Sequence, residues 1–177
     1  MAIGGVAYKL IGQTVNAGEL APRTRHAWAI NTAKCEACGI CETACVRTPS
    51  AVKATNDQFH CSNCVVCYGH ISATNIDSDK IMSEGPRVCK HDAVVRQPFQ
   101  EGDDFFVYSI DDNKCTACGK CVHQCAEKGS KSMFLILRPD LCLGCNSCNI
   151  AAKCPAGAVE KVLIHTEDDV RDEADFF

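Results

Sequence analysis

The sequence predicts a small α+β fold, made of short β-hairpins and short helices arranged around cysteine-rich loops. Sixteen of the 177 residues are cysteine, a proportion typical of disulfide scaffolds and metal proteins. Strand-like apolar runs precede and follow these loops. Large side chains are scarce, since aromatic residues make up 6% of the chain and Trp28 is the single tryptophan. We therefore expect bound inorganic groups and their enclosing loops to fill the interior.

The sixteen cysteines fall into four groups, which we number as motifs one to four. Motifs one and three, CEACGICETAC and CTACGKCVHQC, share the spacing C-x2-C-x2-C-x3-C. Motif two has a distant fourth cysteine, and motif four has a longer final gap followed by a proline. In chain order the motifs contain Cys35, Cys38, Cys41 and Cys45; Cys61, Cys64, Cys67 and Cys89; Cys115, Cys118, Cys121 and Cys125; and Cys142, Cys145, Cys148 and Cys154.

This spacing favours cubane iron-sulfur clusters over the other chemistries of cysteine. Disulfides need thiols in pairs, and pairing does not explain a repeated ladder of three. Structural zinc is usually held by two C-x2-C knuckles that grip the ion from two sides. A [4Fe-4S] cluster has four irons, and thiols at every third residue can reach three of them while a remote cysteine reaches the fourth. The sequence thus predicts four [4Fe-4S] clusters, with all sixteen cysteines as iron ligands.

The C-x2-C-x2-C-x3-C run, together with CPAGAV at residues 154–159, resembles bacterial ferredoxins. The fourfold set, over roughly residues 26–165, resembles the four-cluster electron-transfer subunits of molybdenum and tungsten oxidoreductases. Examples are the beta subunits of formate dehydrogenase and dimethyl sulfoxide reductase, and the small subunits of tungsten aldehyde oxidoreductases. The resemblance implies a non-catalytic subunit that relays single electrons between a catalytic pterin-containing subunit and a further redox subunit or carrier.

The resemblance also implies two ferredoxin-like modules, in which the fourth cysteine of each motif ligates the cluster of the other. DAVVRQPF (92–99) and FFVYSI (105–110) read as strands around a turn, like the hairpin between the two motifs of a ferredoxin. Motifs two and three would then form one module. HAWAIN (26–31) and AVEKVLIH (158–165) are also strand-like, and in the ferredoxin fold such flanking strands pair, which joins motifs one and four.

This nested arrangement has an alternative in sequential pairing, of motif one with two and motif three with four. The segment VRTPSAVKATNDQFH between motifs one and two shows no clear pair of apolar runs and argues against sequential pairing, whereas MFLILRPDL between motifs three and four is compatible with it. The nested ligand sets are Cys35, Cys38, Cys41 and Cys154; Cys142, Cys145, Cys148 and Cys45; Cys61, Cys64, Cys67 and Cys125; and Cys115, Cys118, Cys121 and Cys89.

Some features depart from the family pattern. Only Cys154 is followed by proline, and NIAAK makes the last gap of motif four two residues longer than usual, which we interpret as a tolerated loop variation. Cys89 departs most, because the insertion at residues 68–88 separates it from the rest of motif two. An insertion of this length predicts either a partner-contact loop or a flexible surface excursion.

The chain divides into an N-terminal arm at residues 1–25, a four-cluster domain at 26–165 with its inner module at about 58–128, and an acidic tail at 166–177. We interpret both ends as interaction arms, with a solvated tail as the simpler alternative for the second. Gly39, Gly119 and Gly144 lie inside the ligand loops, where close backbone approach is expected.

Charged and titratable residues near the motifs have two interpretations. His60 and His123 lie close to cysteines and could tune cluster potentials, although a surface or packing role is commoner. Nine lysines could offset the negative charge of the clusters, although such lysines are usually solvated. They are Lys34, Lys53, Lys90, Lys114, Lys120, Lys128, Lys131, Lys153 and Lys161.

The net charge of -4 argues against a partner that is a nucleic acid, and no apolar run approaches the roughly eighteen residues of a membrane span. The sequence has no phosphate loop or dinucleotide fingerprint, so we predict no catalytic residue. We expect a cytoplasmic protein, with export to the periplasm alongside a partner as the alternative. Alternative functions are a freely diffusing polyferredoxin and the electron-transfer subunit of a hydrogenase, and copies could stack into larger assemblies.

Overall fold

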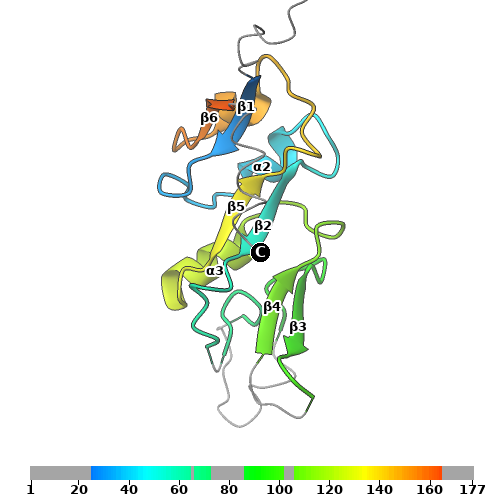
Figure 1. Ribbon diagram of the computed structural model, residues 1–177, viewed down its shortest axis with the longest axis vertical. Coiled ribbons are helices and arrows are strands. Elements are labelled where there is room, and N and C mark those ends of the chain that lie inside the picture. Colours follow the sequence, from blue (N-terminus) through cyan, green and yellow to red (C-terminus); the bar gives the residue numbers. More distant parts are fainter. Residues whose placement is uncertain (1–24, 65, 73–85, 102–105, 165–177) are drawn as a thin grey trace, which may run out of the picture. The chain divides into compact units, whose positions relative to one another are not determined.

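The computed structural model describes residues 25–64, 66–72, 86–101 and 106–164 (Figure 1). Within these ranges the strands and helices are short, which confirms the predicted α+β class. The N-terminal arm, the acidic tail and most of the insertion lie outside the described residues. In chain order the elements are β1 Arg25–Ile30, α2 Ile40–Ala44, β2 Val52–Asn56, β3 Val94–Pro98, β4 Phe106–Ile110, α3 Lys120–Lys128, β5 Met133–Leu137, α4 Asn149–Lys153 and β6 Val159–Ile164.

The strands form three two-stranded sheets, β1–β6, β2–β5 and β3–β4. Two of these pairs confirm the strand predictions. HAWAIN and AVEKVLIH contain β1 and β6, which pair although more than a hundred residues separate them. DAVVRQPF and FFVYSI contain β3 and β4, which run antiparallel with Val94 opposite Ile110 and Pro98 opposite Phe106. The Arg96 guanidinium covers the Phe106 ring at 3.5 Å.

The third sheet contains a strand that the sequence pattern does not predict. β2 lies in the segment that shows no clear pair of apolar runs, and it pairs antiparallel with β5, so that Val52 faces Leu137 and Asn56 faces Met133. Figure 1 shows β2 and β5 side by side. β5 alternates buried and half-buried residues, whereas the first three residues of β2 are all buried. Because β2 has a polar composition, its own sequence does not identify it as a strand. Its apolar partner, β5, follows motifs two and three in the chain.

Residues Trp28–Lys161 form one compact unit, which contains all sixteen cysteines. Its core is made largely of small side chains and thiols. Val52, Leu135 and Ile150 are among its most buried members. Five cysteines are themselves buried, namely Cys41, Cys67, Cys115, Cys121 and Cys125. An apolar core of this kind offers limited hydrophobic stabilisation, which agrees with the expectation that bound groups complete the interior.

The helices place cysteines at regular positions. In α3, Cys121 and Cys125 are four residues apart and lie on one side of the helix. Cys41 lies in α2, and Cys45 is the residue at its C-terminal cap. The gap NIAAK is not a loop variation as predicted, because its residues form α4 with Cys148 and Cys154 as the two caps and Ile150 buried. Among the described residues, no helix has the length and apolarity needed to span a membrane.

Candidate metal centres formed by four groups of thiols

The structure gathers the cysteines into groups that combine two motifs each. We name each group after the motif that supplies three of its thiols. The motif-one, motif-three and motif-four groups each line a separate small cavity. Their members are Cys35, Cys38, Cys41 and Cys154; Cys115, Cys118, Cys121 and Cys89; and Cys142, Cys145, Cys148 and Cys45. These linings follow the nested grouping, and Cys89, the cysteine that departs most from the family pattern, lies with motif three.

The motif-two group consists of Cys61, Cys64, Cys67 and Cys125. The charges of these thiols act on one another or on the nearby Tyr108. Burial, followed by the charges of Cys125 and Cys61, raises the pKa of Cys67 to about 11, against the opposing effect of nearby backbone amides. Burial and the charges of Cys67, Cys61 and Cys64 likewise raise the pKa of Tyr108 to about 12. Cys125 of α3 therefore lies beside the thiols of motif two.

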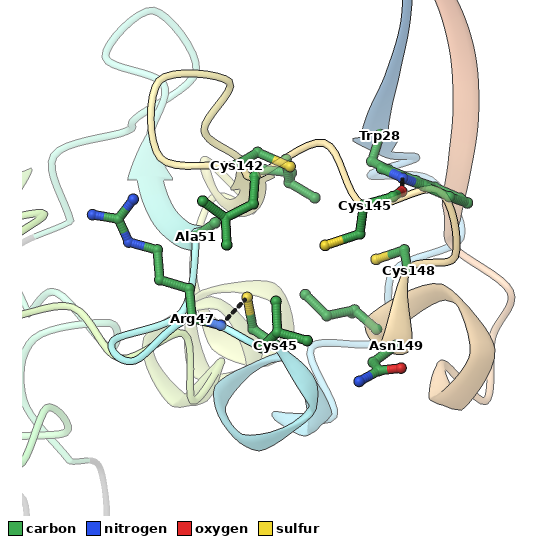
Figure 2. A pocket seen from close by; sticks show the side chains of 12 residues that line it. Trp28, Cys45, Arg47, Ala51, Cys142, Cys145, Cys148 and Asn149 are labelled. Carbon is green, nitrogen blue, oxygen red and sulfur yellow. Dashed lines mark hydrogen bonds between the residues drawn. The ribbon is translucent and has the colours of Figure 1, made fainter.

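Figure 2 shows the motif-four group, in which the thiols of Cys45, Cys142, Cys145 and Cys148 point toward a common space. Trp28 of β1 lies at its edge and donates a hydrogen bond from Nε1 to the Cys145 carbonyl oxygen at 2.7 Å. This bond ties the first strand of the unit to a loop 117 residues later. The single tryptophan thus positions the motif-four loop.

Backbone amides donate hydrogen bonds to several of the sulfur atoms, at N···Sγ distances of 3.3–3.4 Å. Three of the acceptors are the fourth cysteine of their own motif, and they occur in different groups. Amide donors of this kind stabilise negative charge on sulfur, which a thiolate ligand requires. The pairs are Arg47 to Cys45, Ala93 to Cys89, Ala158 to Cys154, Ala54 to Cys115 and Gly144 to Cys142.

Burial favours the neutral form of several thiols. It raises the pKa of Cys41 and of Cys121 to about 12, and the charges of the neighbouring cysteines in each group act in the same direction. Cys45 differs, because the amides of Ala51 and Arg47 outweigh the effect of burial and lower its pKa. Four thiolates this close repel one another unless positive charge lies among them, which is what a metal centre supplies.

The loops of motifs one and three touch at two glycines. A Cβ atom on Gly119 would lie 2.4 Å from the Ala37 carbonyl oxygen, and one on Gly39 would lie 2.8 Å from the Cys118 carbonyl oxygen. Both glycines have positive φ, 74° and 83°. The predicted close approach is thus between the two loops. Gly144, the third predicted glycine, has no atom of the described residues within 4 Å of such a Cβ.

A larger cavity, of about 550 Å³, opens at the same junction. Cys38 and Cys118 line it from the two loops, and among the described residues its other lining includes four basic residues and no acidic residue. The basic residues are Arg87, Lys90, Lys120 and His123. His123 also lies 3.6 Å from the Glu127 carboxylate.

The two histidines singled out from the sequence are exposed and lie beside carboxylates. His60 Nδ1 is 2.5 Å from Asp57 Oδ2, and His123 pairs with Glu127. Sequence reasoning missed His70, which is 4% exposed and packs against Tyr108 with the rings tilted by 57° and their centroids 5.5 Å apart. Burial, together with the charges of Arg87 and Arg96, lowers the pKa of His70 to about 4.

Of the two interpretations given for Lys53 from the sequence, a solvated lysine is wrong. Lys53 is a 1% exposed residue of β2, and its Nζ donates to the Cys115 carbonyl oxygen at 2.6 Å. No sequence signal distinguishes it from the other lysines near the motifs, because its burial depends on strands contributed by remote segments.

In the described part of the chain, no three or more His, Cys, Asp or Glu side chains converge closely enough to hold one metal ion. Thiols that each ligate a different iron of a cubane need not converge on one point. Three of the four groups instead line a small cavity of their own. No family model matches the chain.

Proposed function

We propose that the chain is an electron-transfer protein that holds four [4Fe-4S] clusters in two nested ferredoxin-like modules. One observation carries this proposal: each group combines three thiols of one motif with a fourth thiol from another motif. That exchange of fourth ligands is the pattern of two-cluster ferredoxins. Disulfide pairing and zinc knuckles do not explain it.

The sheet β2–β5 supports the nested modules. Motifs two and three, with the hairpin β3–β4 between them, lie in the chain between β2 and β5. For this inner module, β2 and β5 are the flanking strands. For the outer module, which contains motifs one and four with β1 and β6 as flanking strands, the same two strands form the hairpin between the motifs. One sheet serves both modules, and this is why the inner module can interrupt the outer one.

The residues of each group fit the proposed clusters. The four nested sets supply sixteen thiols, amide donors reach five of the sulfurs, and burial limits solvent at the inner groups. A [4Fe-4S] cluster, when bound, would accept and release one electron at a time. The protein supplies spacing, insulation from water and hydrogen bonds that adjust the potential.

The order of the groups follows from the elements that join them. α3 carries Cys121 of the motif-three group and Cys125 of the motif-two group one helical turn apart. Cys41 and Cys45 connect the motif-one and motif-four groups at the same spacing. The motif-one and motif-three loops touch at Gly39 and Gly119. The thiol groups therefore follow one another in the order motif four, one, three and two.

The resemblance of the motifs supports a class of partner. We propose a catalytic oxidoreductase subunit with a molybdenum or tungsten pterin as one partner, and a further redox subunit or carrier as the other. The chain itself is proposed to be non-catalytic, because the chemistry of bond breaking belongs to the partner. We also propose that it is cytoplasmic, as expected from the sequence.

The first test is elemental analysis of the anaerobically purified native complex. We expect about sixteen irons per chain, with matching acid-labile sulfide, and stoichiometric tungsten or molybdenum from the partner. Nickel in place of these metals would indicate a hydrogenase, and iron on a chain without partners would indicate a diffusing polyferredoxin. Zinc without sulfide would overturn the proposal of clusters.

The nested ligand sets have their own test in electron paramagnetic resonance (EPR) spectra of the reduced chain. Cys45→Ala should perturb the same signal as Cys148→Ala, because both thiols line one cavity. Cys64→Ala is the matched control, since sequential pairing would place Cys45 on the cluster of motif two. A Cys45→Ala spectrum that matches Cys64→Ala, with the Cys148→Ala signal intact, contradicts the nested sets.

A further inference from the structure

Lys53 is a lysine enclosed by the shared sheet. It is 1% exposed, and its strand neighbours Val52 and Ala54 are 0% and 3% exposed. β5 covers the strand on one edge, with Ile136 opposite Lys53. The end of β2 is held against β4, where Asn56 Nδ2 donates to the Tyr108 carbonyl oxygen at 2.9 Å. The lysine side chain therefore has no route to bulk water.

The enclosed ammonium group is directed at the motif-three group. Nζ donates to the Cys115 carbonyl oxygen at 2.6 Å, and the amide of the next residue, Ala54, donates to Cys115 Sγ at 3.3 Å. Two successive residues of β2 thus bind Cys115, Lys53 at the backbone carbonyl of the cysteine and Ala54 at its sulfur. Cys115 is itself 7% exposed, so the contact is sealed from solvent.

No carboxylate compensates this lysine in the described part of the chain. The ion pairs found there join other cations to acidic side chains, on Lys34, Lys114, Arg138, His60 and His123. Buried charges are normally paired, because removing a charge from water without a partner is unfavourable. The contact with Cys115 brings Lys53 to the group in which the proposed function places four thiolates, on Cys115, Cys118, Cys121 and Cys89.

We propose that Lys53 is a counter-charge of the motif-three group and raises the reduction potential of its cluster. This inference rests on the proposed function. Reduction of a bound cluster would take one electron from a donor and add one negative charge close to Lys53. A fixed cation stabilises the reduced form more than the oxidised form, so this cluster should be easier to reduce with Lys53 than without it.

The test is a redox titration of the full four-cluster chain, followed by EPR. Lys53→Met keeps the length of the side chain and removes the charge. We expect one of the four midpoint potentials to fall, so that the reduced-to-oxidised ratio of that cluster at its former midpoint drops about tenfold, which is 59 mV for one electron. The other three midpoints should stay unchanged. Lys128→Met, at an exposed position of α3, is the control and should leave all four unchanged.

The affected cluster is identified by combining Lys53→Met with a ligand change. If the lowered midpoint disappears in combination with Cys121→Ala and persists with Cys41→Ala, the affected cluster belongs to the motif-three group. That result supports the proposal. A Lys53→Met chain with full iron content and four unchanged midpoints overturns it. So does a fallen midpoint that belongs to another group.

Lys53→Met could fail to assemble, and two further variants cover that case. Lys53→Gln lacks the charge but retains a donor for the Cys115 carbonyl oxygen, so a fallen midpoint supports the proposal and an unchanged one overturns it. If both neutral variants fail, normal assembly of Lys53→Arg shows that the charge itself is required. Failure of Lys53→Arg as well assigns Lys53 to packing and overturns the inference. Iron content of the unmodified chain reports separately on the proposed function.

Discussion

The loops of motifs one and three share their cysteine spacing and the sequence Ala-Cys-Gly, yet they lie in different surroundings. In motif three, Cys115, Cys121 and Cys125 are buried, whereas in motif one Cys41 alone is buried and Cys38 is exposed. A buried lysine contacts the motif-three loop. The motif-one loop instead contains the exposed Glu36. Burial, then the charges of neighbouring thiols and of Glu36, raise the pKa of Cys35.

Ligand spacing and ligand environment therefore have separate origins. Spacing within a motif is local and selects the kind of metal centre that can bind. Burial and nearby charge come from strands elsewhere in the chain, and they adjust the potential of a centre whose ligands are the same. Two copies of one loop can therefore serve at different potentials within one series.

Removing iron should have the largest effect on stability, and the motif-one loop should lose its metal before the motif-three loop. A chelator should deplete the motif-one group before the motif-three group, because Cys38 is exposed while Cys115 and Cys121 are buried. Complete removal should abolish cooperative unfolding, since so much of the core consists of thiols that need a metal. Iron analysis with circular dichroism checks both stages. Iron-free protein with a sharp thermal transition would contradict this expectation.

Gly119→Ala should destabilise the chain strongly, on the order of 3 kcal/mol, because the new Cβ would meet the Ala37 carbonyl oxygen and the backbone has positive φ. Gly39→Ala should behave similarly. Gly144→Ala is the matched control, since it shares the positive φ (63°) but meets no described atom, and it should cost about 1 kcal/mol. Thermal midpoints of the iron-loaded variants measure the difference. Equal losses at Gly119 and Gly144 would show that the loops do not touch.

Lowering the pH should reduce the free energy of unfolding through protonation of His70. Its pKa is about 4 in the folded chain and about 6.5 in an unfolded one. The unfolded chain therefore binds more protons between these values, and stability falls as the pH drops from about 6.5 toward 4, by up to about 3 kcal/mol. His70→Gln should flatten this part of the pH profile, whereas His60→Gln, at an exposed position, should not. Denaturant titrations from pH 5 to 7 measure the slope, and an unchanged slope in His70→Gln would exclude His70 as its cause.

Glu36→Gln should have the smallest effect. Removing this carboxylate should raise the midpoint potential of the motif-one cluster slightly, because negative charge near a cluster disfavours reduction. Glu36 is exposed, so salt should screen the shift. Redox titrations at low and high ionic strength check the direction and the screening. A downward shift, or one larger than that of Lys53→Met, would reverse the proposed contrast between the two loops.

Sequence patterns predicted those strands whose apolar character is visible within a single segment. β3 and β4 carry strong apolar runs around a nearby turn, and β1 and β6 were recognised in the same way. β2 was missed because Lys53, Thr55 and Asn56 interrupt its apolar pattern. α4 was also missed, since five residues between two cysteines are too few to show helical periodicity.

The sixteen ligand candidates, their spacing within each motif and the local strands can be predicted from the sequence, because these depend on residues a few positions apart. Only the tertiary structure shows that Cys45, Cys89 and Cys154 line cavities with thiols of other motifs, that Gly39 and Gly119 bring two loops into contact, and that Lys53 is buried. These features depend on the pairing of β2 with β5 across 76 intervening residues. Such pairing is set by the sum of many packing contacts between distant segments, and no single stretch of sequence contains it.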